Sequence, residues 1–210
     1  MVAPNVKSKT APEDKDFWAT PNELYNGALA YFVQKGLLDP QSVYVGDVCA
    51  SKHNAKHERY FTEEQDALIQ DWIEFAWQER CNGVLWCNPP YSRKQKERFI
   101  AKGIHFGENV KAEGAGVIML LPADTSTAWF SECVRHAKAV AFICNGRISF
   151  INNSTGERSD GNNTGSVLVL FAKRDKGQKV ARTLYVTRSK LEELGKELKN
   201  EPKTFLYGRT

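Results

Sequence analysis

The sequence predicts an α/β fold built on a doubly wound, mostly parallel sheet. Short apolar segments recur along the chain, and each is bounded by glycine, proline or polar residues, as buried strands are. Longer amphipathic segments with helical periodicity lie between them. This alternation indicates a sheet whose two faces are both covered by helices. The predicted strands are residues 43–48, 84–87, 116–121, 140–144 and 166–172, with a further short one at 59–61.

The first helix is predicted from its start and stop signals. Thr20 is the expected N-cap, Pro21 takes the first helical position, and Glu23 stands in capping-box register. Gly36 ends the helix. The later helices are predicted from their apolar periodicity at residues 95–106 and 127–137 and in at least the later part of residues 62–78.

The composition is that of a folded protein with one domain. The 210 residues are 41% hydrophobic and 26% charged, which excludes a mainly disordered chain. Residues 1–15 are polar and form the expected flexible leader, without the pattern of a signal peptide. No apolar run approaches the length of a membrane span. We therefore expect a cytoplasmic protein with no membrane partner.

The five cysteines indicate buried thiols rather than disulfides. They include no CxxC pair, and most of them lie in apolar segments. Cys49, His53 and His57 are spaced by four residues, which would align them on one face of a helix as metal ligands. A fourth ligand is not evident in the sequence, so we expect no metal site.

Positive charge is concentrated toward the carboxyl-terminal end of the chain. The net charge is +4, but residues 173–210 alone hold 11 lysines and arginines against five acidic residues. We therefore treat residues 174–210 as a basic C-terminal extension of the main domain. Such an extension fits binding to a phosphate backbone, and the alternative is a solvated surface helix.

Residues 88–91, Asn-Pro-Pro-Tyr, are the most informative segment. They follow the predicted strand 84–87, so Asn88 lies at the carboxyl end of a strand, where open α/β sheets bind ligands. The two prolines stiffen the backbone there. The Asn88 amide oxygen and the Pro89 carbonyl can both accept hydrogen bonds from one NH2 group while the Tyr91 ring stacks on its plane. The segment predicts a site for a planar amine, with an ordinary turn as the alternative.

This motif is similar to the catalytic motif of amino-methyltransferases that use S-adenosylmethionine. The wider chain, from Phe17 to about Phe171, resembles the phage-type DNA N6-adenine methyltransferases of the Dam family. Six short segments in one order carry the resemblance. They are Trp18-Ala19-Thr20-Pro21, Asp47-Val48-Cys49-Ala50-Ser51 with Asn54, and residues 60–68, 86–92, 120–125 and 146–150.

The resemblance implies a Rossmann-like class I methyltransferase that acts as a site-specific DNA adenine N6-methyltransferase. It would transfer a methyl group from S-adenosylmethionine to the exocyclic amine of an adenine flipped out of double-stranded DNA, in a short target sequence. The catalytic domain would be residues 16–173, with a recognition loop near residues 145–165. The catalytic residues would be Asn88, Pro89, Pro90 and Tyr91. We expect a monomer, located in a bacterial host cell if a phage encodes it, and both restriction evasion and regulation are open as its role.

The resemblance also implies a cofactor site around the first predicted strand. Its residues would be Thr20, Pro21, Asp47, Cys49, Ala50, Asn54 and Asp66. Asp47 would bind the methionine ammonium or orient the backbone around it, and Asp66 would contact the adenine amine of the cofactor. Gly46 is the one glycine of a motif that is commonly glycine-rich, so its backbone contacts are open. A plain helix cap is the alternative for Thr20 and Pro21, and an exposed carboxylate is the alternative for Asp66.

Four residues are expected to contact DNA: Arg93, Lys94, Arg147 and Phe150. The first two follow the catalytic motif, where Lys96 and Arg98 could join them in clamping phosphates. Phe150, like Trp129, is a candidate for a second ring on the target base, with core packing as the alternative. We expect the basic extension to add sequence-blind affinity and the polar loop 145–165 to read the bases.

Two other functions remain open at this point. One is methyl transfer to another planar amine, an RNA base or a protein glutamine, by enzymes that usually carry the glycine-rich cofactor motif absent here. The other is a non-catalytic nucleic-acid-binding protein on the same fold, against which the intact segment 88–91 and Asp47 argue. A titration with the cofactor separates these two classes.

Overall fold

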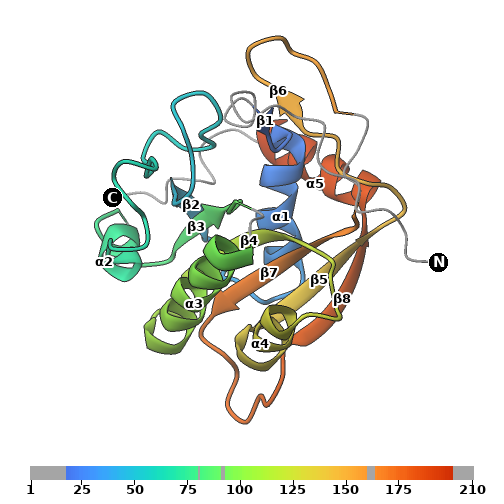
Figure 1. The fold of residues 1–210 in the computed structure, drawn as a ribbon. Coiled ribbons are helices and arrows are strands. Elements are labelled where there is room, and N and C mark those ends of the chain that lie inside the picture. The colour runs from blue at the N-terminus through green and yellow to red at the C-terminus, as the bar shows by residue number, and fades with distance from the viewer. Residues whose placement is uncertain (1–17, 80, 91–92, 160–163, 201–210) are drawn as a thin grey trace, which may run out of the picture.

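A six-stranded sheet with the strand order β2-β3-β4-β7-β5-β8 forms the centre of the fold (Figure 1). The computed structural model describes residues 18–79, 81–90, 93–159 and 164–200. β7 is antiparallel to both of its neighbours, and the other five strands run in one direction. The prediction of a mostly parallel sheet is therefore confirmed. The strands are β2 (Val43–Asp47), β3 (Gly83–Cys87), β4 (Gly116–Pro122), β5 (Ala139–Cys144), β7 (Ser166–Ala172) and β8 (Arg182–Thr187).

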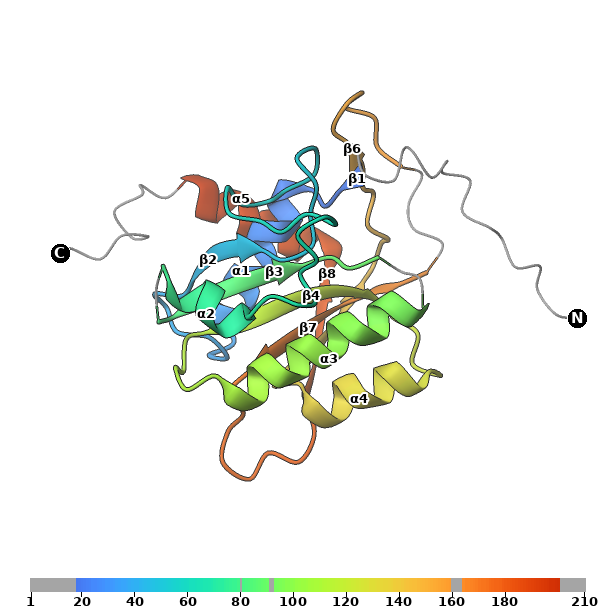
Figure 2. The same ribbon diagram turned by 60° about the vertical axis from the view of Figure 1, so that its left-hand side comes forward.

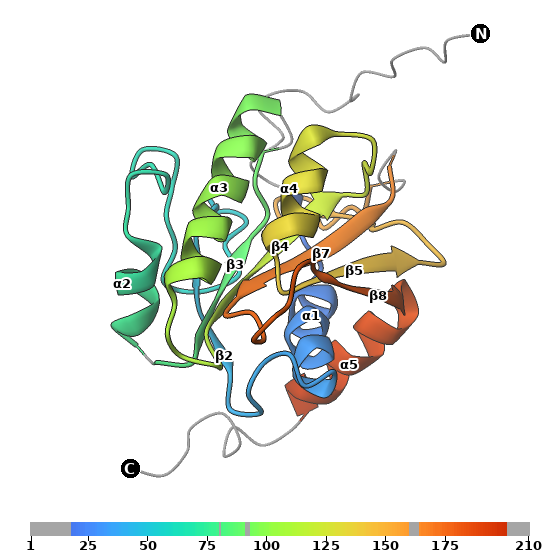
Figure 3. The same ribbon diagram turned by 90° about the horizontal axis from the view of Figure 1, so that it is seen from below.

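Helices cover both faces of this sheet (Figures 2 and 3). One face carries α1 (Asn22–Gln34) and α5 (Arg188–Asn200), and the other carries α2 (Trp72–Trp77), α3 (Arg93–Asn109) and α4 (Ala128–His136). β3 and β4 are consequently buried along their whole length. Within the described part of the chain, no helix is both long and apolar enough to span a membrane.

The first helix begins later than its sequence signals predict. Its cap is Pro21, whose carbonyl oxygen accepts the N–H groups of Leu24 and Tyr25 at 3.1 and 3.0 Å. The prediction that Thr20 caps this helix is therefore wrong. Thr20 instead precedes the cap by one residue and is buried, with 2% of its surface exposed.

The helix predicted in at least the later part of residues 62–78 is confirmed there, as α2. Thr62 and Gln65 do exchange the two hydrogen bonds of a capping box, from the Thr62 N–H to Gln65 Oε1 and from the Gln65 N–H to Thr62 Oγ1. The backbone then turns at Asp66, which has a φ of +43°. α2 begins only after Asp71, whose carboxylate accepts the first free N–H groups of the helix.

α1 and α5 cross in close contact at two glycines. A Cβ atom on Gly27 would lie 1.9 Å from the carbonyl oxygen of Leu191, and one on Gly195 would lie 1.8 Å from that of Glu23. Only glycine permits so close an approach of two backbones. β8 and α5, which the sequence places in a basic extension, thus widen the sheet and cover one of its faces.

A two-stranded ribbon lies beside the main sheet (Figure 2). β1 (Trp18–Ala19) pairs antiparallel with β6 (Ile151–Asn152), and Trp18 stands opposite Asn152. The chain then turns back, and Asn152 Oδ1 accepts the N–H groups of Ser154 and Thr155. The predicted loop 145–165 therefore contains a hairpin at residues 151–158.

Candidate active site

Two neighbouring strands end at the same edge of the sheet and bring Asp47 and Asn88 close together. β2 and β3 are parallel, Asp47 at the end of β2 pairs with Trp86, and Asn88 follows directly after β3. The strand predicted at residues 59–61 is reduced to a single bridge, in which Tyr60 pairs with Asp47. This edge is where open α/β sheets bind their ligands.

A small pocket with a cavity volume of about 20 Å³ opens at this edge. Five of the site residues predicted from the sequence line it: Thr20, Asp47, Cys49, Asn54 and Asn88. Trp18, Ala19, Lys56 and Trp86 complete the lining. None of these four was predicted as a site residue, although Trp18 and Ala19 stand in a segment that carries the family resemblance. Lys56 gave no sequence signal of its own.

Asp47 is the buried carboxylate of the pocket, with 2% of its surface exposed. Its two oxygens accept the backbone N–H groups of Cys49 and Lys56, each at 3.1 Å. Burial raises the pKa of Asp47 to about 7, although these two hydrogen bonds favour the ionised form. Residues 48–56 wind around the carboxylate in turns, in which Asn54 Oδ1 accepts a backbone N–H at 2.7 Å. A cationic ligand would offset the cost of burying this group.

Asn88 contributes a buried acceptor to the same pocket. Its Oδ1 accepts no hydrogen bond from any residue that the structure describes. Nearly all buried polar side-chain atoms of folded proteins are hydrogen-bonded, so such an atom marks a place for a donor on a ligand. Pro89 is buried beside it and Pro90 is exposed. Tyr91, the predicted stacking residue, lies outside the described residues.

The remaining predicted cofactor residues lie outside the lining of this pocket. Asp66 Oδ1 accepts the Leu68 N–H at 3.1 Å, and its positive φ is one that aspartate tolerates better than most side chains. Ala50 donates its N–H to the carbonyl oxygen of Phe61 at 3.0 Å, and Pro21 caps α1. Each therefore has a local structural role, and its contact with the cofactor stays a prediction.

The zinc alternative depended on a helix through residues 49–57. These residues form turns and bends, so Cys49, His53 and His57 do not share a helical face. Among the residues that the structure describes, no three His, Cys, Asp or Glu side chains are grouped as metal ligands.

The residues expected to contact DNA follow strands that end at the pocket edge. Lys94 lies in the first turn of α3, after β3, and Arg147 follows β5; both are exposed. Phe150 is half-buried and packs against the core on the α1 side of the sheet. The Arg93 side chain lies outside the described part of the structure.

Lys96 and Trp129 are both buried and lie against each other. Lys96 is 7% exposed, and its Nζ lies 4.3 Å from the centre of the Trp129 ring. Burial lowers the pKa of Lys96, and the ring face offers its cation a partner in place of water. Trp129 itself is 5% exposed and packs on Phe130. Core packing, the alternative for Trp129, is therefore what the structure shows, and a phosphate contact by Lys96 stays a prediction.

A mostly parallel α/β sheet with a polar pocket at the ends of β2 and β3 defines the class of ligand-binding α/β enzymes. The particular family follows from comparison with known proteins. The chain matches the family of DNA N-6-adenine-methyltransferases (Dam) over residues 7–198 and belongs to it. The match continues through β8 and α5, beyond the segments that carry the resemblance in the sequence.

Two phage enzymes are similar over most of the chain. The DNA N-6-adenine-methyltransferase of Haemophilus phage HP1 is 42% identical over 166 residues, which are 79% of this chain and 84% of that one. The enzyme of the same name from Escherichia phage T1 is 32% identical over 186 residues, covering 82% and 68% of the two chains. A solved structure from Listeria monocytogenes, assigned as a class I S-adenosylmethionine-dependent methyltransferase, superposes with a TM-score of 0.46 at 11% identity, over 92% of this chain and 73% of that one.

Family membership confirms the function predicted from the sequence. The protein is a DNA adenine N6-methyltransferase, and S-adenosylmethionine is its methyl donor. The α/β architecture agrees with this assignment. Family membership does not assign roles to individual residues, and the roles proposed below are argued from the geometry of the pocket.

Proposed function

We propose that this enzyme methylates an adenine that is flipped out of double-stranded DNA within a short target sequence, and that Asn88 holds the adenine amine. The observation that carries this assignment is the buried Oδ1 of Asn88, which lacks a partner among the described residues and faces the same pocket as Asp47. An acceptor suits the adenine amine, whose two N–H groups are donors. A base stacked inside a duplex has to leave the stack to reach such a pocket.

Asn88 and Pro89 would act on the geometry of the amine nitrogen. The N6 lone pair of adenine is delocalised into the ring, which makes this nitrogen a poor nucleophile. Hydrogen bonds from its two N–H groups to Asn88 Oδ1 and to the Pro89 carbonyl draw it toward tetrahedral geometry and localise the lone pair. The bound cofactor supplies a methyl group that its sulfonium charge has already made electrophilic. Positioning and electrostatics therefore suffice, without a strong base before transfer.

The pocket suits the amino-acid part of S-adenosylmethionine. Asp47 is a buried carboxylate that would gain a counter-ion from an ammonium group, which would in turn lower its pKa. Thr20, Cys49 and Asn54 line the same space. The cavity volume of about 20 Å³ is far below the roughly 300–1,000 Å³ of whole small-molecule sites, so this pocket would take one small group of the cofactor, such as its ammonium. Asp66 remains the candidate for the adenine part.

DNA binding is assigned to the pocket end of the sheet. Exposed Lys94 and Arg147 lie there, next to the strand ends. The hairpin at residues 151–158 is attached to the same region, because β6 pairs with β1 and Asn153 Nδ2 donates to the carbonyl oxygen of His53. Cations supply sequence-blind affinity for phosphates, whereas the polar hairpin would read bases beside the target adenine.

The basic extension is less available to DNA than its net charge indicates. Residues 173–181 lie at the end of the sheet away from Asn88, because Ala172 pairs with Gly116 at the start of β4. Several cations of the extension are also paired with acids. The pairs are Lys173–Glu113, Arg182–Asp175, Arg188–Glu192 and Lys190–Glu193.

Two asparagines at opposite ends of β3 provide a matched test. Asn88→Ala removes the acceptor after the strand, whereas Asn82→Ala changes the residue before it, whose Nδ2 donates to the carbonyl oxygen of Gln41 at 2.8 Å. With unmethylated genomic DNA and S-adenosylmethionine, wild type and Asn82→Ala should modify the same adenines, as mapped by sequencing. Asn88→Ala should lose about 100-fold or more in rate, with cofactor affinity by calorimetry within a few fold of wild type.

A different experimental result would contradict each part of the proposal. Wild-type rates in Asn88→Ala would remove Asn88 from the reaction, and an equal loss of cofactor binding would move it to the cofactor site. Base flipping is measured with 2-aminopurine in place of the target adenine, whose fluorescence should rise on binding to the enzyme. No rise in a complex that methylates the adenine-containing duplex would contradict flipping.

A further inference from the structure

The turn that follows β5 is held by an arginine from the start of α5. β5 and β8 are parallel, and Cys144 pairs with Thr187, so residues 145–147 and the first turn of α5 lie together at the pocket edge of the sheet. Nη1 of Arg188 donates to the carbonyl oxygen of Arg147 at 2.9 Å. The first side chain of α5 therefore fixes the backbone of a residue that we assign to DNA binding.

The backbone of this turn has an uncommon conformation. Asn145 and Gly146 have φ values of +52° and +124°, in the region that favours glycine and, to a lesser extent, asparagine. A Cβ atom on Gly146 would lie 3.3 Å from Arg188 Nε and 3.4 Å from its Cζ, so the guanidinium group packs directly against this glycine. Glycine at position 146 thus permits both the turn and the contact with Arg188.

Arg188 and Arg147 differ in what their side chains face. Arg188 Nε is buried and lies 3.4 Å from Glu192 Oε1 in the next turn of α5, and Nη1 is bonded to the Arg147 carbonyl oxygen. The Arg188 guanidinium is therefore directed at the protein. Arg147 is exposed, while the next residue, Ile148, is 1% exposed in the core on the α1 side of the sheet. The backbone at Arg147 is consequently held on both sides.

We propose that Arg188 is a positioning residue for DNA binding, which holds Arg147 in place to contact a phosphate beside the target adenine. This inference rests on the proposed DNA contact of Arg147. A long cationic side chain loses conformational freedom when it binds a phosphate, and a fixed backbone lowers that cost before DNA arrives. Arg188 thus contributes to DNA binding through the shape of this turn rather than through its own charge.

A double-mutant cycle on the full chain tests the proposal. The DNA probe is a duplex that carries one of the adenines mapped on genomic DNA. Arg147→Ala should weaken binding of this duplex about 10-fold, and Arg188→Met, which keeps an aliphatic chain and removes the donors, about 5-fold. The double variant should bind no more weakly than Arg147→Ala alone, because Arg188 acts only through Arg147. KM for DNA should rise in each variant, while kcat and cofactor affinity stay unchanged.

Two further variants serve as control and independent check. Lys190→Met removes another cation from the first turn of α5, one that is paired with Glu193 at 2.8 Å, and should change neither DNA affinity nor cofactor affinity. Gly146→Ala disturbs the turn from the side opposite Arg188. It should reproduce the loss caused by Arg188→Met and, like it, add nothing to the effect of Arg147→Ala.

Additive losses, with the double variant weaker than Arg147→Ala by the full factor for Arg188→Met, would give Arg188 a role of its own and overturn the proposal. Wild-type affinity in Arg188→Met would overturn it as well. If Arg188→Met does not fold, as judged by its melting curve, Gly146→Ala decides the outcome. Wild-type affinity in Arg147→Ala would remove the DNA contact itself and the proposal with it, whereas a loss in Arg147→Ala alone would reject only the positioning role.

Discussion

The two ends of the sheet differ in whether their polar groups have hydrogen-bonding or ionic partners in the protein. At the pocket end, Asn88 Oδ1 and Trp18 Nε1 are buried without partners among the described residues, and Asp47 has its pKa raised by burial. Each of these features costs stability in the protein alone. Each is also compensated by a ligand with the matching donor, acceptor or charge.

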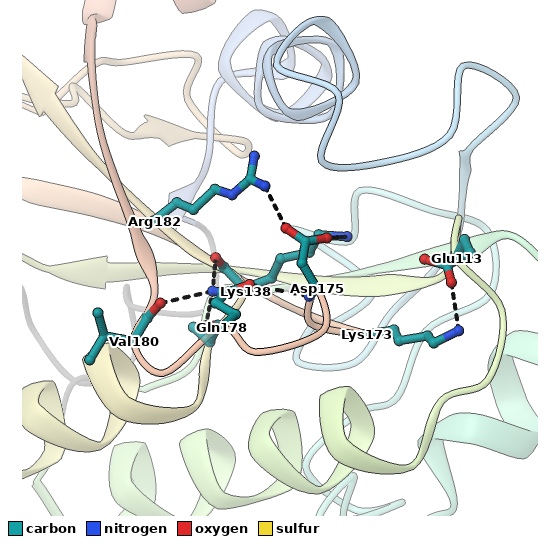
Figure 4. A network of polar contacts seen from close by, with 8 residues as sticks. Glu113, Lys138, Lys173, Asp175, Gln178, Val180 and Arg182 are labelled. Carbon is teal, nitrogen blue, oxygen red and sulfur yellow. Dashed lines mark hydrogen bonds and ion pairs between the residues drawn. The ribbon is translucent and has the colours of Figure 1, made fainter.

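At the other end, the connection between β7 and β8 is held by a polar network that is complete (Figure 4). Asp175 pairs with Arg182 at 2.5 Å and with the nearly buried Lys138 at 3.8 Å. Gln178 Nε2 donates to the carbonyl oxygens of Lys138 and Val180 at 2.8 and 2.9 Å. Here the polar groups satisfy one another and stabilise the fold, so they offer little to a ligand. Asn88 Oδ1 and Trp18 Nε1, which lack partners among the described residues, therefore lie at the end of the sheet where we propose that ligands bind.

The largest expected effect is on cofactor binding at the pocket end. Asp47→Asn removes the proposed counter-ion of the ammonium and should lower affinity for S-adenosylmethionine about 100-fold, since breaking one partner of a buried charge pair costs roughly 2–5 kcal/mol. Asp39→Asn is the matched control, because Asp39 is an exposed carboxylate before the same strand. Calorimetry measures both variants. Equal affinities for Asp47→Asn and wild type would place the ammonium elsewhere.

A second effect of Asp47 concerns stability as a function of pH. Its folded pKa of about 7 lies above that of an unfolded aspartate, so the folded state binds more protons between about pH 4 and 7. Stability therefore falls as pH rises through this window. From pH 5 to 8, wild type should lose roughly 2–3 kcal/mol relative to Asp47→Asn, as measured by urea unfolding of the two proteins without cofactor. A constant difference between them would mean that Asp47 is ionised throughout.

At the polar network around Asp175, we expect a substitution to change the free energy of unfolding and to leave cofactor affinity unchanged. Asp175→Ala leaves Lys138 and Arg182 without their shared partner and should lower the free energy of unfolding by about 1–2 kcal/mol. Cofactor affinity should not change, because the network lies at the far end of the sheet. Urea unfolding and calorimetry on the same preparation check both statements. Weaker cofactor binding by Asp175→Ala would contradict the assignment of ligand binding to the pocket end and of fold stabilisation to the other end.

The smallest expected effect is on the salt dependence of DNA binding. It should differ between two exposed lysines that lie at opposite ends of the sheet. Lys94→Ala should reduce the slope of log affinity for DNA against log salt by about 1, because it would remove one phosphate contact. Lys173→Ala should leave that slope unchanged, because Lys173 is paired with Glu113 at the far end. Binding titrations at several salt concentrations measure the slopes. If Lys173→Ala changes the slope and Lys94→Ala does not, the DNA lies on the basic extension.

Local patterns predicted the fold class and much of the pocket. Buried strands were recognisable in the sequence as short apolar runs. Because parallel strands have their carboxyl ends at one edge of the sheet, Asp47 and Asn88 lie close together as expected. Errors arose where local signals compete. The cap of the first helix is Pro21 and not Thr20, and the Thr62 capping box forms ahead of a turn at Asp66, with the helix following only in the later part of that segment as predicted.

Other features could not be predicted because they depend on contacts distant in sequence. The strand β8 has an exposed, mixed pattern and exists because it pairs with β5 at the edge of the sheet. The charge of the extension was visible, but its pairing with acidic residues and the position of residues 173–181 at the far end were not. Trp18 enters the pocket because β1 pairs with β6, more than 130 residues away.

The sequence by itself determined the chemistry of this protein: a doubly wound sheet, an Asn-Pro-Pro-Tyr segment after a strand, an acidic residue after its neighbour, and membership of a DNA adenine methyltransferase family. These are properties of residue type and local order. Only the tertiary structure decided which polar atoms are left without partners. That depends on where the folded backbone places its N–H groups: those of Cys49 and Lys56, in the turns that follow Asp47, reach its carboxylate, whereas no described residue donates to Asn88 Oδ1.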